Sequence, residues 1–323
     1  MLTRRKALVS AGALLSTGVP FAAQSRPKQH LALLIGVGQV DALPAARRLL
    51  GPANDVALMH EVLIASGLPS SAVTELVTGG LAPTAEAVAG AMRAIEDSAG
   101  SGAKVVFYYA GHGTQVPQAA SRRAMEADGL EEVLLLADVQ RWRGTALDGE
   151  LPNALRDEHL AAWVGRLAAR GANVWVFIDA CHAAGMVRGT SALTAGEIRA
   201  VQATELGVPP LDWRAASRLG RASSVPAYAV PSLLTRPVAL ERRVFALAAR
   251  AQEAAAEGAW RLRGGGRSAV HGAFTYCLAS ALRETRIASV ADLRYELDWR
   301  MSQLSGVDQV AQVMGDRRLR WRG

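Results

Sequence analysis

The chain has 323 residues, of which 50% are hydrophobic, and its 36 basic and 29 acidic residues give a formal net charge of +7. This composition excludes an intrinsically disordered chain, which needs low hydrophobicity and dense charge, and 2 cysteines are too few for a disulfide-framed miniprotein. The basic residues are scattered among acids without a lysine-rich run, so we expect no nucleic-acid partner. The length predicts one large α/β domain or two small ones.

The first 23 residues have the composition of an export signal. Thr3-Arg4-Arg5-Lys6 precedes a weakly apolar, uncharged stretch over 7–23, and the paired arginines resemble the twin-arginine type. This stretch is too short and too broken by glycine, serine and proline to span a bilayer. We therefore predict an export signal over 1–23, a linker over 24–30, and an exported, periplasmic protein without a stable membrane anchor.

Strand and helix patterns alternate along the first part of the chain. Continuous apolar runs and β-branched residues predict strands over 31–37, 73–77, 104–109 and 174–178. Apolar residues at helical spacing predict one helix capped by Asn54 or Asp55 and stopped at Gly67, one capped by Thr84, and one over 160–168. This alternation predicts an α/β fold, a three-layer α/β/α sandwich with a mostly parallel sheet.

The rhythm is lost over 183–241, where prolines interrupt a stretch rich in serine, arginine and alanine, and we expect a long, loose connection there. Regular structure resumes with a strand over 244–248 and a helix over 272–283. A last helix is expected after Ser289, which forms a capping box with Asp292.

Reactive side chains follow two of the predicted strands. Ala110-Gly-His112-Gly comes after one strand, and Asp179-Ala-Cys181-His comes after another. Ligands of open parallel sheets gather beyond the carboxyl ends of strands. A cysteine thiolate is a nucleophile for acyl transfer, and a neighbouring imidazole can activate it and protonate the leaving amine. Either motif alone is weak, because a lone histidine is more often structural and a lone buried cysteine more often packs as a small hydrophobe.

Together these motifs resemble the caspase-like cysteine peptidases, especially the metacaspases and the bacterial orthocaspases. The resemblance implies a caspase-like fold, with His112 and Cys181 as the catalytic dyad and the backbone N–H groups of Gly113 and Cys181 as the oxyanion hole. It rests on four segments, which are 49–57, Val106-Phe-Tyr-Tyr-Ala-Gly-His-Gly-Thr114, 128–133 and Phe177-Ile-Asp-Ala-Cys-His182.

The same resemblance implies a substrate-binding role for two acids. Residues that match Asp55 and Asp179 line the primary specificity pocket of metacaspases and select Arg or Lys. Two carboxylates in a confined cleft suit a guanidinium. The alternatives are that Asp55 is a first-turn acid placed against its helix dipole and that Asp179 caps local amides.

Calcium is a candidate cofactor, although none is required by the dyad. Asp128, Glu131, Asp157 and Glu158 supply the oxygen atoms that hard cations prefer, but Arg188 falls where the family places an acid. We favour the alternative that Asp157 and Glu158 form the first turn of their helix.

Three further residues are given no catalytic role. Cys277 lies in an apolar helix, so we expect it to pack in the core, and a disulfide with Cys181 would consume the nucleophile. His271 is expected in a surface loop, and for His182, beside the nucleophile, no second catalytic role follows.

By resemblance, the peptidase domain over 31–323 has a large-subunit-like part over 31–187, the connection over 188–241 and a small-subunit-like part over 242–323. Many relatives mature by cutting such a connection. The arginines at which self-cleavage is predicted are Arg199, Arg214, Arg218, Arg221 and Arg236.

The sequence thus predicts an endopeptidase that cuts peptides or proteins after Arg or Lys through a thioester. The alternative is a catalytically silent caspase-like binding module. A flavodoxin-type nucleotide binder would need a phosphate loop after the first strand, and Gly36-Val-Gly38 is too short for one. The physiological substrate and the oligomeric state stay open.

Overall fold

The computed structural model describes residues 29–118, 130–146, 148–181, 198–210, 240–249, 254–260, 268–284 and 287–321. Several predictions fall outside these ranges, among them the export signal over 1–23 and the residues Asp128, His182, Arg188, Arg214, Arg218, Arg221 and Arg236. Within the described ranges, none of the helices has the length and apolar character that a bilayer span requires.

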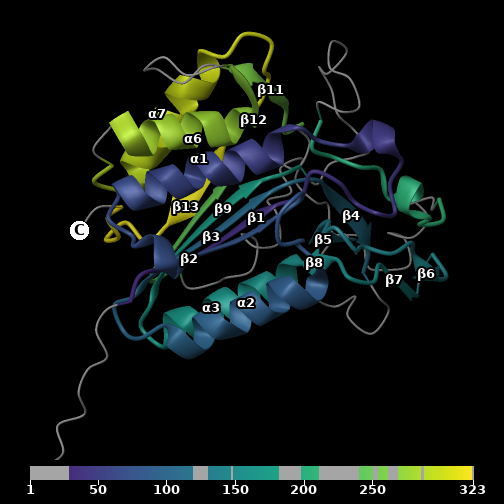
Figure 1. The fold of residues 1–323 in the computed structure, drawn as a ribbon, viewed down its shortest axis with the longest axis horizontal. Helices are drawn as coiled ribbons and strands as arrows, with labels where there is room; N and C mark the ends of the chain where they lie inside the picture. The colour runs from purple at the N-terminus through teal and green to yellow at the C-terminus, as the bar shows by residue number, and fades with distance from the viewer. Residues whose placement is uncertain are drawn as a thin grey trace, which may run out of the picture.

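A six-stranded sheet forms the middle of the molecule, with the strand order β13-β10-β9-β3-β1-β2 (Figure 1). Neighbouring strands are parallel except β13, which runs antiparallel to β10. Every residue of β1 and β3 is buried, which explains their continuous apolar sequences. The strands are β1 (Leu31–Gly36), β2 (Val73–Val77), β3 (Lys104–Ala110), β9 (Asn173–Asp179), β10 (Arg243–Leu247) and β13 (Gln312–Gly315).

Helices cover both faces of this sheet. Figure 1 shows α1 (Gly51–Ala65), α6 (Ala273–Glu284) and α7 (Val290–Ser302) on one face, and α2 (Ala85–Ser98) and α3 (Asp157–Ala169) on the other. The chain buries a separate hydrophobic cluster under each layer, and successive residues of β1 alternate between the two clusters. The predicted three-layer α/β/α sandwich with a mostly parallel sheet is therefore confirmed.

Side-chain caps fix the start of α2 and of α7. The Thr84 side chain accepts a hydrogen bond from the Ala87 N–H at 3.2 Å, and the Ser289 side chain accepts one from the Asp292 N–H at 3.1 Å, so both predicted caps are confirmed.

The prediction that Asn54 or Asp55 caps α1 is wrong, because this helix begins at Gly51 with Pro52 in its first turn. Asp55 consequently lies inside the helix, is fully buried, and is available for contacts at the end of the sheet.

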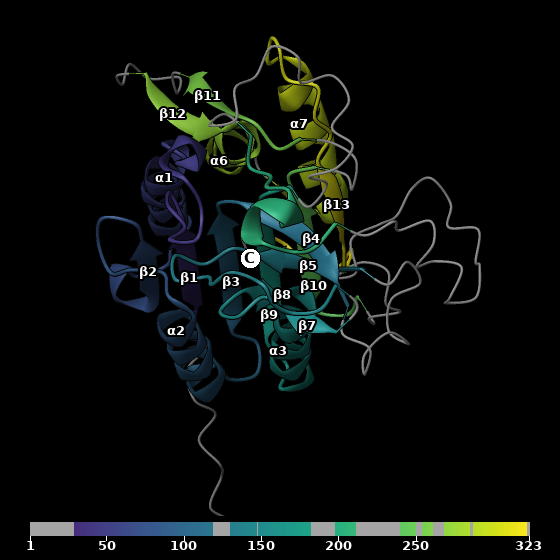
Figure 2. The same ribbon diagram turned by 90° about the vertical axis from the view of Figure 1, so that its right-hand side faces the viewer.

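Three smaller sheets surround the main one. A three-stranded sheet contains β4 (Gly113–Pro117), β5 (Leu130–Leu134) and β8 (Leu155–Arg156), and two hairpins pair β6 (Arg143–Gly144) with β7 (Gly149–Glu150) and β11 (Glu257–Trp260) with β12 (Ala269–Gly272). Figures 1 and 2 show the β11–β12 hairpin beside α1 and α6. The described 3₁₀ turns are η1 (Ala45–Arg47), η2 (Ser70–Ala72) and η4 (Ala203–Leu206).

One part of the expected loose connection is packed. Residues 198–210 lie within it, yet Val201 and Leu206 are fully buried and Arg199 has no exposed surface. The Arg199 N–H donates to the carbonyl of Ala255 at 2.8 Å, which holds this segment beside the chain that leads into β11. The expectation of a loose chain is therefore wrong for 198–210, whereas the division at 187 and 241 stays a prediction.

Candidate active site

Strand register brings the two reactive motifs together. β3 and β9 are adjacent parallel strands, and their last residues, Ala110 and Asp179, are register partners. His112 and Cys181 each follow two residues beyond these partners, so both emerge at the same edge of the sheet. Each of the two side chains is only 1% exposed. The structure thus brings together the residues that the sequence predicted as a dyad.

A backbone carbonyl orients the His112 ring. His112 Nε2 lies 2.6 Å from the carbonyl oxygen of Arg47, and because a carbonyl can only accept, Nε2 carries the hydrogen and Nδ1 keeps its lone pair. Nδ1 is buried and makes no hydrogen bond among the described residues. Burial lowers the pKa of His112 to about 4, although the Arg47 carbonyl opposes this shift. The ring is therefore neutral at pH 7 and has a basic nitrogen available.

Two backbone N–H groups at the strand ends converge on one oxygen atom. The N–H groups of Gly113 and Cys181 donate to the carbonyl oxygen of Arg199 at 3.2 Å and 3.1 Å. These are the donors that the family resemblance implied for an oxyanion hole, and they hold a carbonyl from a distant part of the chain.

Three carboxylates surround the guanidinium of the same Arg199. Its Nη2 lies 2.5 Å from Asp55 Oδ2 and 3.2 Å from Glu257 Oε2, and its Nη1 lies 3.1 Å from Asp179 Oδ2. All four side chains are buried. We call Asp55, Asp179 and Glu257 the acidic pocket. Its first two members were predicted, and Glu257 was not.

Hydrogen bonds from α6 and the β11–β12 hairpin fix the two predicted carboxylates. Asp55 Oδ1 lies 2.9 Å from His271 Nδ1 and accepts the Gly272 N–H at 3.2 Å. Asp179 Oδ2 accepts the N–H and the hydroxyl of Thr275 at 3.0 Å and 2.5 Å. The expected surface position of His271 is wrong, because this residue lies on β12, packed against α1, and is only 6% exposed.

Glu257 is held by the start of α1. Its Oε1 accepts the Leu50 N–H at 2.8 Å and its Oε2 accepts the Gly51 N–H at 3.2 Å. The start of a helix suits a carboxylate because of its unpaired backbone N–H groups and the helix dipole, and these two hydrogen bonds fix the third acid in the pocket.

Two glycines leave room for the guanidinium. A Cβ atom at Gly51 would lie 2.5 Å from Arg199 Nη2 and 2.8 Å from Glu257 Oε2. A Cβ atom at Gly272 would overlap both Asp179 and Arg199. Any larger residue at either position would thus fill the pocket, which explains why glycine occurs at both walls.

The charged groups of the acidic pocket shift one another's pKa values. Burial raises the pKa of Asp179 to about 6, against the opposing effect of Arg199. Burial alone would lower the pKa of Arg199, but Asp179, Asp55 and Glu257 together raise it well above its ordinary value. The pocket therefore binds a fully charged guanidinium. Asp55 is not a first-turn acid, and Asp179 both accepts local amide hydrogens and pairs with the cation.

The candidate calcium ligands have other roles where they are described. Asp157 and Glu158 begin α3, as favoured, and the Asp157 carboxylate accepts the Glu158 N–H at 2.7 Å. Glu131 lies 3.4 Å from the guanidinium of Arg156. Within the described ranges, no group of three or more His, Cys, Asp or Glu side chains is arranged to hold a metal ion.

The second cysteine, Cys277, packs in the hydrophobic core, as predicted. Cys277 is buried in α6, and burial raises the pKa of its thiol to about 12, so a thiolate does not form there at neutral pH. Cys181 and Cys277 are both free thiols.

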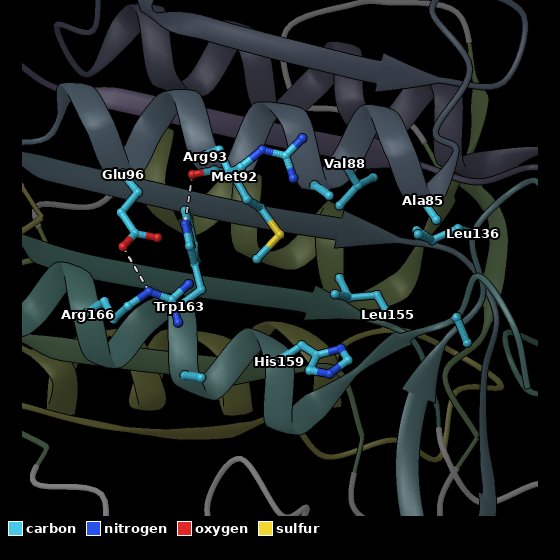
Figure 3. Close-up of a pocket in the computed structure, with 13 residues that line it drawn as sticks. Ala85, Val88, Met92, Arg93, Glu96, Leu136, Leu155, His159, Trp163 and Arg166 are labelled. Carbon is cyan, nitrogen blue, oxygen red and sulfur yellow. Dashed lines mark hydrogen bonds and ion pairs between the residues drawn. The ribbon is translucent and has the colours of Figure 1, made fainter. Parts of the chain in front are cut away.

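A separate pocket of about 450 Å³ lies between α2 and α3 (Figure 3). Met92, Trp163 and Leu155 give it an apolar wall, and Glu96 pairs with Arg166 at 2.8 Å at its rim. It contains neither member of the dyad nor any member of the acidic pocket.

The family model described as the caspase domain matches residues 29–318. The chain belongs to the caspase domain family. It is therefore a caspase-like protein whose family consists of cysteine peptidases that act on peptides or proteins.

Two solved structures resemble the fold. Protein GSU0716 from Geobacter sulfurreducens is 22% identical, with a TM-score of 0.56 over 88% of this chain and 92% of that one. Caspase-1 from Spodoptera frugiperda is 12% identical, with a TM-score of 0.47 over 95% of this chain and 94% of that one. No curated protein sequence matches the chain.

Two functional groups at this site were not predicted from the sequence. The Arg47 carbonyl is a backbone group, so no side-chain pattern marks it. Glu257 is brought to the pocket by a hairpin whose strands the sequence did not predict. Arg199 was predicted only as one of several linker arginines, and its place in the pocket depends on contacts with residues that are distant in sequence.

Proposed function

We propose that this protein is a cysteine endopeptidase that cleaves peptide bonds after Arg or Lys, with Cys181 as nucleophile and His112 as acid and base. One observation supports the proposal most directly. The carbonyl oxygen of Arg199 accepts hydrogen bonds from two backbone N–H groups, and the guanidinium of the same residue lies among three carboxylates. A peptide substrate with arginine before the scissile bond would make the same two sets of contacts.

The chemistry follows from the groups at the strand ends. His112 Nδ1 accepts the Cys181 thiol proton, and the thiolate attacks the substrate carbonyl carbon. Negative charge on the carbonyl oxygen is stabilised by the Gly113 and Cys181 N–H groups, and such a donor typically contributes about 10²–10³ in rate. His112 then protonates the leaving amine, and water hydrolyses the thioester. The Arg47 carbonyl keeps the ring in the required tautomer throughout and stabilises the imidazolium.

The acidic pocket supports the specificity. Arginine is favoured because its planar fork can contact Asp55, Asp179 and Glu257 at once, whereas lysine offers one compact ammonium group. An aspartate side chain in this pocket would face three buried carboxylates, which is strongly unfavourable. We therefore expect Arg to be preferred over Lys and Asp to be rejected.

Export and calcium belong to the same proposal. We propose that residues 1–23 direct the chain to the periplasm, where it acts on its substrates. Calcium stays a candidate regulator, and the dyad chemistry above needs no metal.

A fluorogenic peptide panel with Arg, Lys or Asp before the scissile bond tests this function, with and without calcium. We expect turnover of the Arg peptide, slower turnover of the Lys peptide, and none of the Asp peptide. Cys181→Ala should abolish all turnover, and Cys277→Ala is the matched control that should retain it. A folded chain that is silent across the panel would instead support a binding module.

A further inference from the structure

Tyr109 lies near the end of β3, three residues before His112. Its side chain has no exposed surface and packs in the hydrophobic cluster that contains residues of α2 and α3. The preceding residue, Tyr108, belongs to the cluster on the other face of the sheet, as alternation along a strand requires. A phenylalanine would fill the same core space as Tyr109, so the buried hydroxyl needs hydrogen-bond partners of its own.

The Tyr109 hydroxyl bonds to two main-chain carbonyls beside the dyad. Its Oη lies 2.8 Å from the carbonyl oxygen of His112 and 2.7 Å from that of Leu135. A carbonyl can only accept, so Tyr109 supplies the hydrogen that the two oxygens share. Burial raises the pKa of Tyr109 far above its ordinary value, so the hydroxyl keeps this hydrogen at neutral pH.

The His112 carbonyl is held from two sides. Besides the Tyr109 hydroxyl, it accepts the Leu135 N–H at 3.0 Å. Leu135 directly follows β5, so both of its main-chain polar groups join the end of that strand to the loop that carries His112. Tyr109 therefore connects the end of β3, the reactive loop and the end of β5 through one hydroxyl.

Gly111 allows the hydroxyl to reach these partners. A Cβ atom at this position would lie 2.6 Å from Tyr109 Oη and 2.9 Å from its Cζ. Gly111 does not have a positive φ, so its backbone conformation is open to other residues. The close approach of the Tyr109 side chain is what requires glycine before His112.

Two supports act on different parts of His112. The Arg47 carbonyl holds the ring at Nε2, whereas Tyr109 holds the main chain from which the ring extends. The next residue, Gly113, supplies one of the two N–H groups that bind the Arg199 carbonyl. A displaced main chain at His112 would therefore move the base and an oxyanion donor together.

We propose that Tyr109 is a positioning residue for the dyad, and that its hydroxyl holds the His112 main chain so that the imidazole and the Gly113 N–H keep their places during the reaction. This inference rests on the proposed function and adds a residue to it. Tyr109 acts through His112 and takes no part in proton transfer.

Tyr109→Phe tests the proposal, because it removes the hydroxyl and keeps the ring that fills the core. We expect kcat for the Arg peptide to fall roughly 10-fold, since a displacement of 1 Å can cost about 10²-fold and the remaining Leu135 N–H limits the shift. KM should stay unchanged, because the acidic pocket is untouched. Thermal melting sets a temperature at which wild type and all variants are folded.

Gly111→Ala is a second variant, which keeps the phenol but displaces it. The added methyl group occupies the place of Tyr109 Oη, so we expect the same pattern of lower kcat with unchanged KM. Full kcat in the folded Gly111→Ala chain would overturn the proposal, even if Tyr109→Phe did not fold.

Trp163→Phe is the matched control in the same hydrophobic cluster. It also removes one buried donor, the indole N–H that bonds to the Met92 carbonyl at 2.9 Å (Figure 3). Trp163 packs against Phe107 of β3 but makes no contact with the loop that carries His112 among the hydrogen bonds and ring contacts of the described residues. We expect a lower melting temperature and an unchanged kcat.

The outcomes separate this proposal from the proposed function. A Tyr109→Phe chain that keeps the wild-type kcat, or a kcat that falls equally in Trp163→Phe, would overturn the positioning role and leave the peptidase function standing. A folded wild type that does not hydrolyse the Arg peptide would overturn the function and the positioning role with it.

Discussion

The dyad and the acidic pocket adjoin in space, but they are built differently. His112 and Cys181 lie just past the ends of two paired strands, so one register fixes both. The acidic pocket collects Asp55 from α1, Asp179 from β9 and Glu257 from β11, and Arg199 from the connection completes it. The dyad is a local consequence of the sheet, whereas the pocket depends on segments that meet only after the whole chain has folded.

This difference separates chemistry from selectivity. Substitutions in the dyad should remove the reaction for every peptide, and substitutions in the pocket should remove the preference for Arg while leaving the dyad intact. The predictions below test that division.

The largest effect is expected for the dyad. Cys181→Ala and His112→Ala should each lower kcat/KM for the Arg peptide by roughly 10⁴-fold or more, as removal of a nucleophile or its base does elsewhere. The control Cys277→Ala should keep its activity and lose only about 1 kcal/mol of unfolding free energy, because it deletes one small buried group. Loss of activity in the folded Cys277→Ala chain would contradict the division between the cysteines. Peptide hydrolysis and urea unfolding measure the two outcomes.

A smaller but selective effect is expected for the acidic pocket. Asp179→Asn and Asp55→Asn each leave a buried guanidinium short of one partner, which typically costs about 2–5 kcal/mol. Their kcat/KM for the Arg peptide should therefore fall by roughly 30-fold to 5,000-fold. Active-site titration with a small thiol-reactive probe should change little, because Cys181 and His112 are untouched. Equal losses in peptide turnover and in probe reactivity would show that the pocket and the dyad are not separable.

The predictability of the two regions follows from the same difference. Buried strands such as Leu31–Gly36 carry dense apolar runs, so the sheet and the residues at its strand ends could be predicted from local sequence. The start of α1 could not be predicted in this way, because Asn54 and Asp55 are both favourable N-cap residues. The helix instead begins at Gly51, with Pro52 in its first turn. The short β11–β12 hairpin that contains Glu257 has no sequence pattern that predicts its strands.

Long-range ion pairs explain the other miss. Residues around Arg199 have the composition of a loose linker, and only their pairing with acids 144 and 58 residues away in sequence makes them packed. Local patterns contain no information about such partners. The sequence indicated that Asp55 and Asp179 form a site for a cation. It did not indicate that Arg199 of the same chain supplies that cation.

The pH dependence offers an intermediate effect. Burial raises the pKa of Asp179 to about 6 with a guanidinium in place. As pH falls through this value, Asp179 takes up a proton, the pocket loses a negative charge, and the Arg peptide binds more weakly. A substrate guanidinium can enter only after Arg199 has left the pocket, and until it does the Asp179 pKa lacks the cation that lowers it. The acid limb of kcat/KM should therefore lie at a higher pH than that of kcat.

The matched variant for this limb is Asp179→Asn, which has no proton to gain. Its KM for the Arg peptide should be high and nearly constant between pH 5 and pH 7, where the wild-type KM rises as the pH falls. Parallel curves for the two proteins would assign the limb to another group.

The smallest effect is expected at the join between the two regions. Arg47 presents its carbonyl to His112, and its guanidinium donates to Glu205 in η4 at 2.8 Å and 2.6 Å. Glu205→Gln should loosen this support. Both side chains are partly exposed, so the loss should be about 1 kcal/mol or less, which is at most a several-fold decrease in kcat. Glu96→Gln breaks the pair with Arg166 between α2 and α3, in a region that contains neither member of the dyad, and should leave kcat unchanged. A kcat that falls equally in both variants would mean that general stability, and not the orientation of His112, is being measured.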